Sequence, residues 1–334
     1  MENDKKGIIL TGDRPTGRLH LGHYVGSLKN RVELQRSYTQ YVMVADVQAL
    51  TDNADNPEKV RSNVLEITMD NLAVGVDPAL TTFFIQSQIP EIAELTVFFL
   101  NLVTLARLKR NPTIRDEMQQ KGYGEDVPAG FLTYPINQAA DILVLKADTV
   151  PVGEDQLPVL EQANEIIEKF NRFYSKVFDP IKPLLSATPR LVGMDGNAKM
   201  SKSLGNALYL SDSTSVVEEK VMAMYTDPLH VRSEDPGHLE GNVVFDYLDA
   251  FDTDTAGLAE LKAHYQKGGV GDREVKKRLV GVLETFLTPI RKRRSELEKD
   301  PRHVAAILEE GRKKVAVVAQ ETLAEVRKAM KIDY

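Results

Sequence analysis

The chain has 334 residues, which is enough for a catalytic domain and a smaller second domain. Hydrophobic residues make up 42 % and charged residues 27 %, as in ordinary soluble globular proteins, and the absence of cysteine excludes disulfides, thiol nucleophiles and cysteine-based metal sites. The net charge of −7, from 42 basic and 49 acidic residues, argues against a protein that coats nucleic acid regardless of sequence, although a local basic patch could still bind one.

The start of the chain is polar. Residues 1–6 contain no apolar segment of a secretory signal, and no apolar run in the chain approaches the roughly 18 residues of a membrane span. We therefore expect a cytoplasmic protein that has no membrane as a partner.

A glycine-rich turn follows the first predicted element. The apolar run Ile8–Leu10 predicts a buried strand, and a helix is predicted over His23–Gln35. A turn between a strand and a helix suits a phosphate, because helix-terminal N–H groups face it. The turn is neither of the two common phosphate loops. Gly12 and Gly17 have the spacing of one, but Arg18-Leu19 follows them where Lys and Ser/Thr are needed, and the pattern G-x-G-x-x-G is missing.

Two histidines flank a glycine at the start of the predicted helix, in the segment His20-Leu21-Gly22-His23. Two imidazoles beside open backbone space suit a phosphate group on which charge builds during a reaction. Alternatively, each histidine satisfies only a local hydrogen bond. The neighbouring glycines favour the phosphate.

The next elements predict a parallel sheet. Apolar strands are predicted at Tyr41–Ala45 and Thr82–Ile85, with a helix beginning at Pro57 between them. This strand–helix–strand unit places ligands at the carboxyl ends of the strands. Residues 91–108 predict one apolar helix that suits either the core or a subunit interface. We interpret the polar residues 109–131 as a mobile connection over the site.

The helix predicted over Tyr134–Leu145 carries three polar side chains on one face. Tyr134, Gln138 and Asp141 are spaced i, i+4, i+7, and Pro135 is placed in the first turn. Polar groups among apolar neighbours are costly to bury without partners. We favour a specific polar ligand as the partner over a hydrogen-bonded network within the core.

A further strand–turn–helix unit follows, with a strand at Thr149–Val152 and a helix over Leu157–Asn171. A carboxylate of the turn, Glu154 or Asp155, could accept hydrogen bonds from a ribose or could cap the helix.

Further on, the segment Lys199-Met200-Ser201-Lys202-Ser203 lies between glycines. Its two lysines could swing onto a leaving polyphosphate and away again, although most such loops are only solvated surface.

Helical patterns replace the strands after residue 211. Helices are predicted over 215–225, 274–287 and 303–330. Basic residues cluster at 276–278 and 291–294, where they form either solvated helix faces or contacts to a phosphate backbone.

Taken together, these motifs resemble the class I aminoacyl-tRNA synthetases. Residues 20–23 match the HIGH motif of that family, and residues 199–203 match its KMSKS motif letter for letter. Within the class, three segments are similar to the tryptophanyl branch: Thr11–Gly17, Ala139–Leu143 and Val150–Gln156. The resemblance covers essentially the whole chain.

The resemblance implies an α/β fold with a Rossmann-type, parallel-sheet catalytic domain over residues 1–208, which binds ATP and the amino acid and supplies a dimer interface. It implies a mainly α-helical anticodon-binding domain over residues 209–334, whose last helix could pack back on the catalytic domain. The implied reaction joins L-tryptophan and ATP into an adenylate, releases pyrophosphate, and passes the tryptophan to tRNA(Trp). ATP is then a substrate, Mg²⁺ is bound through its phosphates without a metal site of the protein, and the enzyme is a homodimer.

The resemblance also assigns residues to roles. It implies four catalytic residues: His20, His23, Lys199 and Lys202. It implies an ATP site made of Arg14, Pro15, Thr16, Gly22, His23, Gly153, Glu154, Asp155, Leu191, Lys199, Met200, Ser201, Lys202 and Ser203. It implies an amino-acid site made of Tyr134, Gln138, Asp141 and Gln156. Within these sets, Asp141 would accept the indole N–H and the two lysines would hold the departing pyrophosphate.

The sequence departs from the usual family pattern at four places. Asp46-Val47-Gln48 stands where Asp-Gln-His is more usual, and Gln138 stands where a methionine is common. Arg115 replaces a lysine near the phosphates, and Gly22-His23 replaces Gly-Asn. Since every phosphate-handling position keeps a plausible donor, we expect a divergent form that keeps the function.

Three alternatives stay open. The pattern of Tyr134, Gln138 and Asp141 is also that of tyrosyl-tRNA synthetases, so tyrosine is the alternative substrate. Small-molecule nucleotidylyltransferases carry a similar histidine turn, but the 199–203 loop and the long helical half argue against them. A non-catalytic relative that binds tRNA, an amino acid or a protein would have little use for the two lysines.

Overall fold

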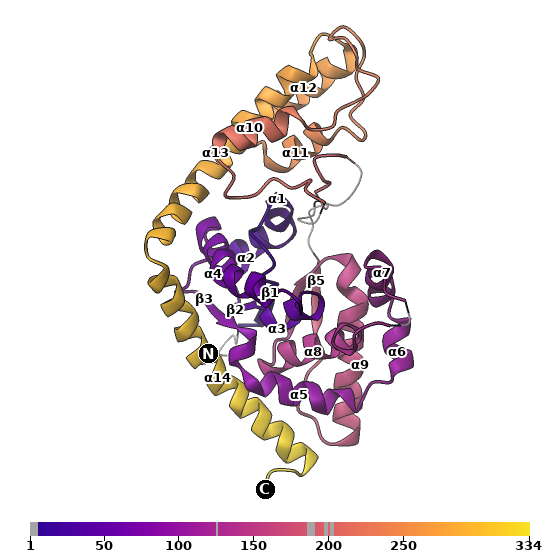
Figure 1. The fold of residues 1–334 in the computed structure, drawn as a ribbon, viewed down its shortest axis with the longest axis vertical. Helices are drawn as coiled ribbons and strands as arrows, with labels where there is room; N and C mark the ends of the chain where they lie inside the picture. The colour runs from indigo at the N-terminus through magenta and orange to yellow at the C-terminus, as the bar shows by residue number, and fades with distance from the viewer. Residues whose placement is uncertain (1–5, 125, 186–190, 197–199, 201–203) are drawn as a thin grey trace, which may run out of the picture.

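One parallel sheet forms the centre of the molecule (Figure 1). The computed structural model describes residues 6–124, 126–185, 191–196, 200 and 204–334, and within them five strands pair in the order β3-β2-β1-β4-β5. The strands are β1 (Ile8–Asp13), β2 (Thr39–Val44), β3 (Thr81–Ile85), β4 (Thr149–Val152) and β5 (Lys182–Leu185). The strand order reverses between β1 and β4, so their carboxyl ends form the crevice where such sheets bind ligands. The expected parallel α/β fold is confirmed.

The helices cover both faces of the sheet and build the C-terminal region. Those of the first part are α1 (Leu21–His23), the π-helical turn η1 (Tyr24–Leu28), α2 (Lys29–Leu34), α3 (Asp46–Ala49), η2 (Leu50–Asp52), α4 (Pro57–Val74), η3 (Gln86–Gln88), α5 (Pro90–Leu100), α6 (Leu105–Arg110), α7 (Pro112–Gln120), α8 (Ala129–Val144), η4 (Glu154–Gln156) and α9 (Leu157–Phe173). Those of the C-terminal part are α10 (Thr214–Met222), α11 (Val243–Phe251), α12 (Thr255–Lys267), α13 (Asp272–Lys299) and α14 (Pro301–Met330). Across the described residues, every helix is too short or too polar to cross a membrane.

Several element boundaries differ from the sequence predictions. The helix predicted over 91–108 is two helices, α5 and α6, because Thr104 begins a new helix and accepts a hydrogen bond from the Arg107 N–H. The connection predicted over 109–131 contains α7 and the first turn of α8. Pro135 therefore lies inside α8 and not in its first turn.

Two hydrophobic clusters lie on opposite faces of the sheet. Along β2, Val42 and Val44 point into one cluster, whereas Met43 and the following Ala45 point into the other. This alternation is the period-two pattern of a strand that is buried on both faces. The continuous apolar run in the sequence is the signature of that environment.

Helix α14 crosses the edge of the sheet beside β3 and continues toward α5 (Figure 1). Its first half contributes Val304 and Leu308 to one hydrophobic cluster, and its second half contributes Val315 and Ala319 to the other. The crossing point is Gly311, where an added Cβ would lie 1.7 Å from the backbone oxygen of Phe83. A glycine is required there because nothing larger fits between the helix and the strand.

Gly311→Ala is expected to lower the free energy of unfolding by about 3 kcal/mol, because the helix must move off the sheet edge. Gly281 of α13 supplies the matched control, since an added Cβ there meets no atom within 4 Å. Gly281→Ala is expected to raise the same quantity by about 0.5–1 kcal/mol through its better helix propensity. Urea unfolding followed by circular dichroism measures both, and equal effects would contradict the close packing at Gly311.

The basic clusters of the sequence are largely engaged within the fold. Lys276 donates to the backbone oxygens of Met222 (3.0 Å) and Met224 (2.7 Å). Arg278 pairs with two aspartates, and Arg294 is buried in an ion pair between α13 and α4. These three side chains are therefore neither a solvated face nor free phosphate contacts, because internal partners already use their charge.

Candidate active site

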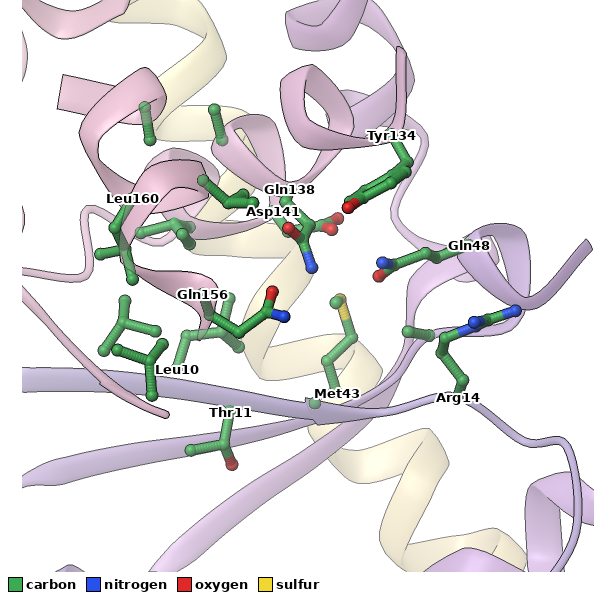
Figure 2. A pocket seen from close by; sticks show the side chains of 18 of the residues that line it. Leu10, Thr11, Arg14, Met43, Gln48, Tyr134, Gln138, Asp141, Gln156 and Leu160 are labelled. Carbon is green, nitrogen blue, oxygen red and sulfur yellow. The ribbon is translucent and has the colours of Figure 1, made fainter. Parts of the chain in front are cut away.

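A cavity of about 350 Å³ opens at the carboxyl ends of the central strands (Figure 2). Apolar side chains form much of its wall, with Leu10 from β1, Met43 from β2 and Leu160 from α9 among them. Its polar lining includes the five residues Arg14, Tyr134, Gln138, Asp141 and Gln156. The predicted face of α8 thus does point into one cavity, together with Arg14 and Gln156 from the turns that follow β1 and β4.

Asp141 is the most deeply buried polar group of the cavity, at 1 % exposure. Gln86, the residue after β3, donates its amide nitrogen to both carboxylate oxygens at 2.8 and 3.0 Å. The same nitrogen lies 2.9 Å from the Asn137 oxygen. Burial raises the pKa of Asp141 to about 7, which the Gln86 hydrogen bonds oppose and the Asp46 charge assists.

Gln86 was not among the predicted site residues. The sequence feature that could have indicated Gln86 is its position directly after the third predicted strand, at the sheet edge where ligands bind. That position alone does not say which way a side chain points. The structure shows that it orients the carboxylate of Asp141.

Charged groups gather at the side of the cavity where α7 lies. Arg14 forms an ion pair with Asp52, which also binds Lys121 at 2.5 Å. Glu117 of α7 lines the cavity near Tyr134. Burial and the Glu117 charge raise the pKa of Tyr134, so its hydroxyl stays protonated and can donate a hydrogen bond.

A buried ion pair anchors the end of β1. The Arg31 guanidinium binds the Asp13 carboxylate, one contact measuring 3.0 Å, and Asn71 donates to the same carboxylate at 3.0 Å. Burial opposes the charged form of Asp13, yet Arg31 and Asn71 hold the pKa of Asp13 below its usual value. The glycine-rich turn therefore leaves the sheet from a rigid base.

The histidine turn lies outside the lining of the cavity. The His20 backbone N–H lies 3.2 Å from His23 Nδ1, and the two imidazole centroids are 3.7 Å apart. An added Cβ on Gly22 would lie 3.0 Å from the His20 ring, so the close pair of rings depends on the glycine. The turn opens the short helix α1, in which the Leu21 N–H donates to the Leu208 oxygen and the His23 N–H to the His20 oxygen, each at 2.9 Å.

Met200 joins the second predicted motif to this turn. Its sulfur lies 3.3 Å from the Gly22 backbone nitrogen, and its side chain is buried. Two segments about 180 positions apart in the sequence, 20–23 and 199–203, thus meet at Met200. Four predicted residues of the loop, Lys199, Ser201, Lys202 and Ser203, lie outside the described residues.

The other predicted ATP residues that the structure describes do not line the cavity. Pro15 and Thr16 follow Arg14 in the turn after β1. Gly153 precedes η4, in which Glu154 and Asp155 are exposed. Leu191 is buried, and its backbone oxygen lies 3.4 Å from the Met200 nitrogen.

Known proteins resemble this chain over its whole length. The family model described as tRNA synthetases class I (W and Y) matches residues 2–288. A tryptophan–tRNA ligase from Clostridium longisporum is 57 % identical over 98 % of both chains, and one from Streptococcus mutans is 55 % identical over 98 % of this chain and 99 % of its own.

A solved structure is similar at the level of the fold and of the sequence. The tryptophanyl-tRNA synthetase of Campylobacter jejuni, complexed with ADP and tryptophan, has a TM-score of 0.85 and 30 % identity over 97 % of this chain and 99 % of its own. The strand order, the cavity at the switch point and the meeting of the two motifs agree with this likeness. The chain therefore belongs to the class I tRNA synthetases of the tryptophanyl and tyrosyl family.

Proposed function

We propose that this chain is a tryptophan–tRNA ligase, an AMP-forming class I aminoacyl-tRNA synthetase. It activates L-tryptophan with ATP and transfers the tryptophan to tRNA(Trp) for protein synthesis. The observation that carries the proposal is the cavity at the switch point, in which the buried Asp141 carboxylate is oriented by Gln86 among apolar walls. An indole ring needs such walls and one hydrogen-bond acceptor. Full-length relatives named tryptophan–tRNA ligase support the choice of substrate.

The amino acid occupies the cavity in this proposal. Asp141 accepts the indole N–H, and its burial makes the contact selective, because a ligand without a donor would place an apolar group against the buried carboxylate where a hydrogen bond belongs. Tyr134 and Gln156 contact the amino group, and Gln138 lines the cavity beside Asp141 (Figure 2). The volume of about 350 Å³ is within the range of small-ligand sites.

ATP lies between the cavity and the histidine turn in this proposal. Gly153, Glu154 and Asp155 meet the adenosine, and Leu191 lies near the adenine. The phosphates lie at Arg14, Pro15 and Thr16 and at the turn of His20, Gly22 and His23. Met200, Lys199, Ser201, Lys202 and Ser203 of the second motif also bind them. Mg²⁺ arrives bound to the phosphates of ATP.

The chemistry needs no nucleophile from the protein. A carboxylate oxygen of tryptophan attacks the α-phosphorus and forms the new P–O bond. The bond from the α-phosphorus to the bridging oxygen breaks, and its electron pair leaves with pyrophosphate. Charge grows on the leaving group, where the imidazoles of His20 and His23 and the ammonium groups of Lys199 and Lys202 stabilise it.

Pyrophosphate exchange tests the proposal directly. We expect exchange of labelled pyrophosphate into ATP that depends on tryptophan and not on tyrosine. Tyrosine-dependent exchange would favour the tyrosyl alternative, whose solved representative from Archaeoglobus fulgidus, complexed with L-tyrosine, has a TM-score of 0.67 and 25 % identity. Exchange that needs a phosphorylated cofactor precursor would favour a small-molecule nucleotidylyltransferase, and tRNA binding without exchange would favour a non-catalytic relative.

The raised pKa of Asp141 predicts how tryptophan binding depends on pH. An indole N–H binds a carboxylate better than a protonated acid, so binding competes with a proton. Because the pKa of the empty site is about 7, the Kd for tryptophan is expected to rise by up to about tenfold for each pH unit below 7. Asp141→Asn is expected to bind weakly with no such slope. A flat wild-type profile between pH 5 and about 7 would contradict the pKa assignment.

The raised pKa of Asp141 affects folding stability and tryptophan binding in opposite directions as the pH rises. The folded pKa of Asp141 lies above its ordinary value of 3.8, so the stability that this group contributes is complete below that value and is lost as the pH rises toward 7. The empty enzyme is therefore expected to gain stability from tryptophan most clearly near and above neutral pH.

Domain organisation, assembly and location complete the proposal. We place the catalytic domain at residues 1–208 and the anticodon-binding domain at residues 209–334, with α14 of the second packed on β3 of the first. The exposed apolar side chains Val97, Leu100 and Leu105 of α5 and α6 suit the interface of a homodimer. We propose a cytoplasmic enzyme. Light scattering of the purified chain tests its dimeric state.

A further inference from the structure

A buried ion pair connects the long helix α13 to the catalytic part of the molecule. Arg294 of α13 binds the Asp70 carboxylate of α4. Asp70 is 0 % and Arg294 is 3 % exposed. Burial raises the pKa of Asp70, and the Arg294 guanidinium opposes that rise. A buried pair is weak evidence for a stabilising role, since apolar residues of similar size often serve as well. The pair lies next to the histidine turn, and a second contact of Asp70 points to a role there.

The second carboxylate oxygen of Asp70 accepts a hydrogen bond from the backbone next to the histidine turn. Oδ2 lies 2.7 Å from the Leu19 nitrogen, and Leu19 is buried and directly precedes His20. The opposite side of this segment pairs with residues 208–210. Leu210 donates to the Leu19 oxygen at 3.1 Å, and Leu21 donates to the Leu208 oxygen at 2.9 Å.

The segment 19–21 is thus held from two sides. One side is the Asp70 carboxylate, and the other is the stretch that continues the chain beyond the 199–203 loop. Arg291, one turn before Arg294 on α13, donates to the Asp212 backbone oxygen at 2.9 Å and so holds that stretch as well. Through Arg294 and Arg291, helix α13 therefore contacts both groups that hold the histidine turn, namely the Asp70 carboxylate and the stretch of residues 208–212.

We propose that Asp70, held by Arg294, is a positioning residue for adenylate formation: it fixes the backbone of Leu19 and thereby places the imidazoles of His20 and His23 on the phosphates. The inference rests on the proposed function of the turn. It adds that α13, a helix of the C-terminal region, sets the geometry of the first chemical step. Positioning errors of about 1 Å can cost on the order of a hundredfold in rate.

Two substitutions break this link from opposite ends. Asp70→Ala removes the acceptor of the Leu19 N–H, and Arg294→Met removes the group that holds Asp70. Each is expected to lower kcat of tryptophan-dependent pyrophosphate exchange by at least about tenfold, with the Kd for tryptophan changed less than about twofold. Because the chain contains no tryptophan, the change in substrate fluorescence on binding measures that Kd without indole emission from the protein itself.

Conservative variants separate positioning from folding. Arg294→Lys keeps a positive charge beside Asp70 and is expected to recover most of the lost kcat. Asp70→Asn keeps an oxygen for the Leu19 N–H but turns an amide N–H toward the Arg294 guanidinium, so it is expected to recover only part of it. Should Asp70→Ala fail to fold, the comparison of Arg294→Met with Arg294→Lys still decides the question. The urea midpoint of each variant identifies losses that come from unfolding.

Arg327 supplies the matched control. It joins α14 to α5 through two contacts with Glu94, at 2.7 and 2.6 Å, in the half of α14 that packs into the other hydrophobic cluster from Leu19 and Leu21. Arg327→Met is expected to leave kcat unchanged. A wild-type protein without tryptophan-dependent exchange would overturn the proposed function. Normal exchange in the wild type together with unchanged kcat in folded Asp70→Ala or Arg294→Met would overturn only this inference.

Discussion

Lys202→Ala is expected to slow the formation of tryptophanyl-adenylate by about 10²- to 10³-fold. The ammonium group is proposed to act on the departing pyrophosphate, where negative charge grows as the bond to the α-phosphorus breaks. Lys202 follows Met200 by two positions, and Met200 contacts Gly22 in the histidine turn. Pre-steady-state formation of the adenylate, measured by rapid quench with labelled ATP, gives the rate.

The Kd for tryptophan separates this effect from a general loss of the site. Because Lys202 is proposed to contact phosphates and not the amino acid, the fluorescence-derived Kd of Lys202→Ala should stay within about twofold of the wild-type value. Lys202→Arg keeps the charge with a different shape and should fall between the two. An alanine variant that forms adenylate at the normal rate would remove Lys202 from the mechanism.

Asp141→Ala is expected to raise the Kd for tryptophan by about a hundredfold. The substitution leaves the indole N–H without an acceptor in a cavity whose walls are largely apolar. It also leaves the Gln86 amide, which donates to both carboxylate oxygens, without those partners. Fluorescence titration with tryptophan measures the loss.

ATP provides the internal control for Asp141→Ala. The KM for ATP should change little, because Asp141 lies in the cavity assigned to the amino acid. Asp141→Asn keeps one oxygen acceptor and is expected to lose less affinity than the alanine variant. Tryptophan binding that is unaffected in Asp141→Ala would show that the indole lies elsewhere.

The elements that can be predicted from the sequence are those with local causes. Continuous apolar runs mark β2 and β3 because both faces of these strands are buried. Strand β5 escapes such a pattern, since it is a short edge strand with Pro183 inside it and an exposed Lys182 at its start. The break between α5 and α6 depends on one capping threonine, which an apolar run conceals.

The site residues also divide into those that a local sequence pattern predicts and those that it does not. The shared face of Tyr134, Gln138 and Asp141 follows from helical spacing alone, and the structure places all three at one cavity. Gln86 reaches Asp141 across 55 positions of the sequence, and Asp70 reaches Arg294 across 224. No local pattern encodes such contacts, because they arise only when the sheet and its helices assemble.

The crossing of α14 over the sheet edge has a consequence for the order in which the molecule is made. Residues of α14 leave the ribosome after all five strands, and until then the outer strand of the sheet has no cover on the side that Gly311 occupies. A bare strand edge invites pairing with other chains. The nascent enzyme therefore passes through a stage that is prone to aggregation, and a fragment ending before α14 would be trapped in it.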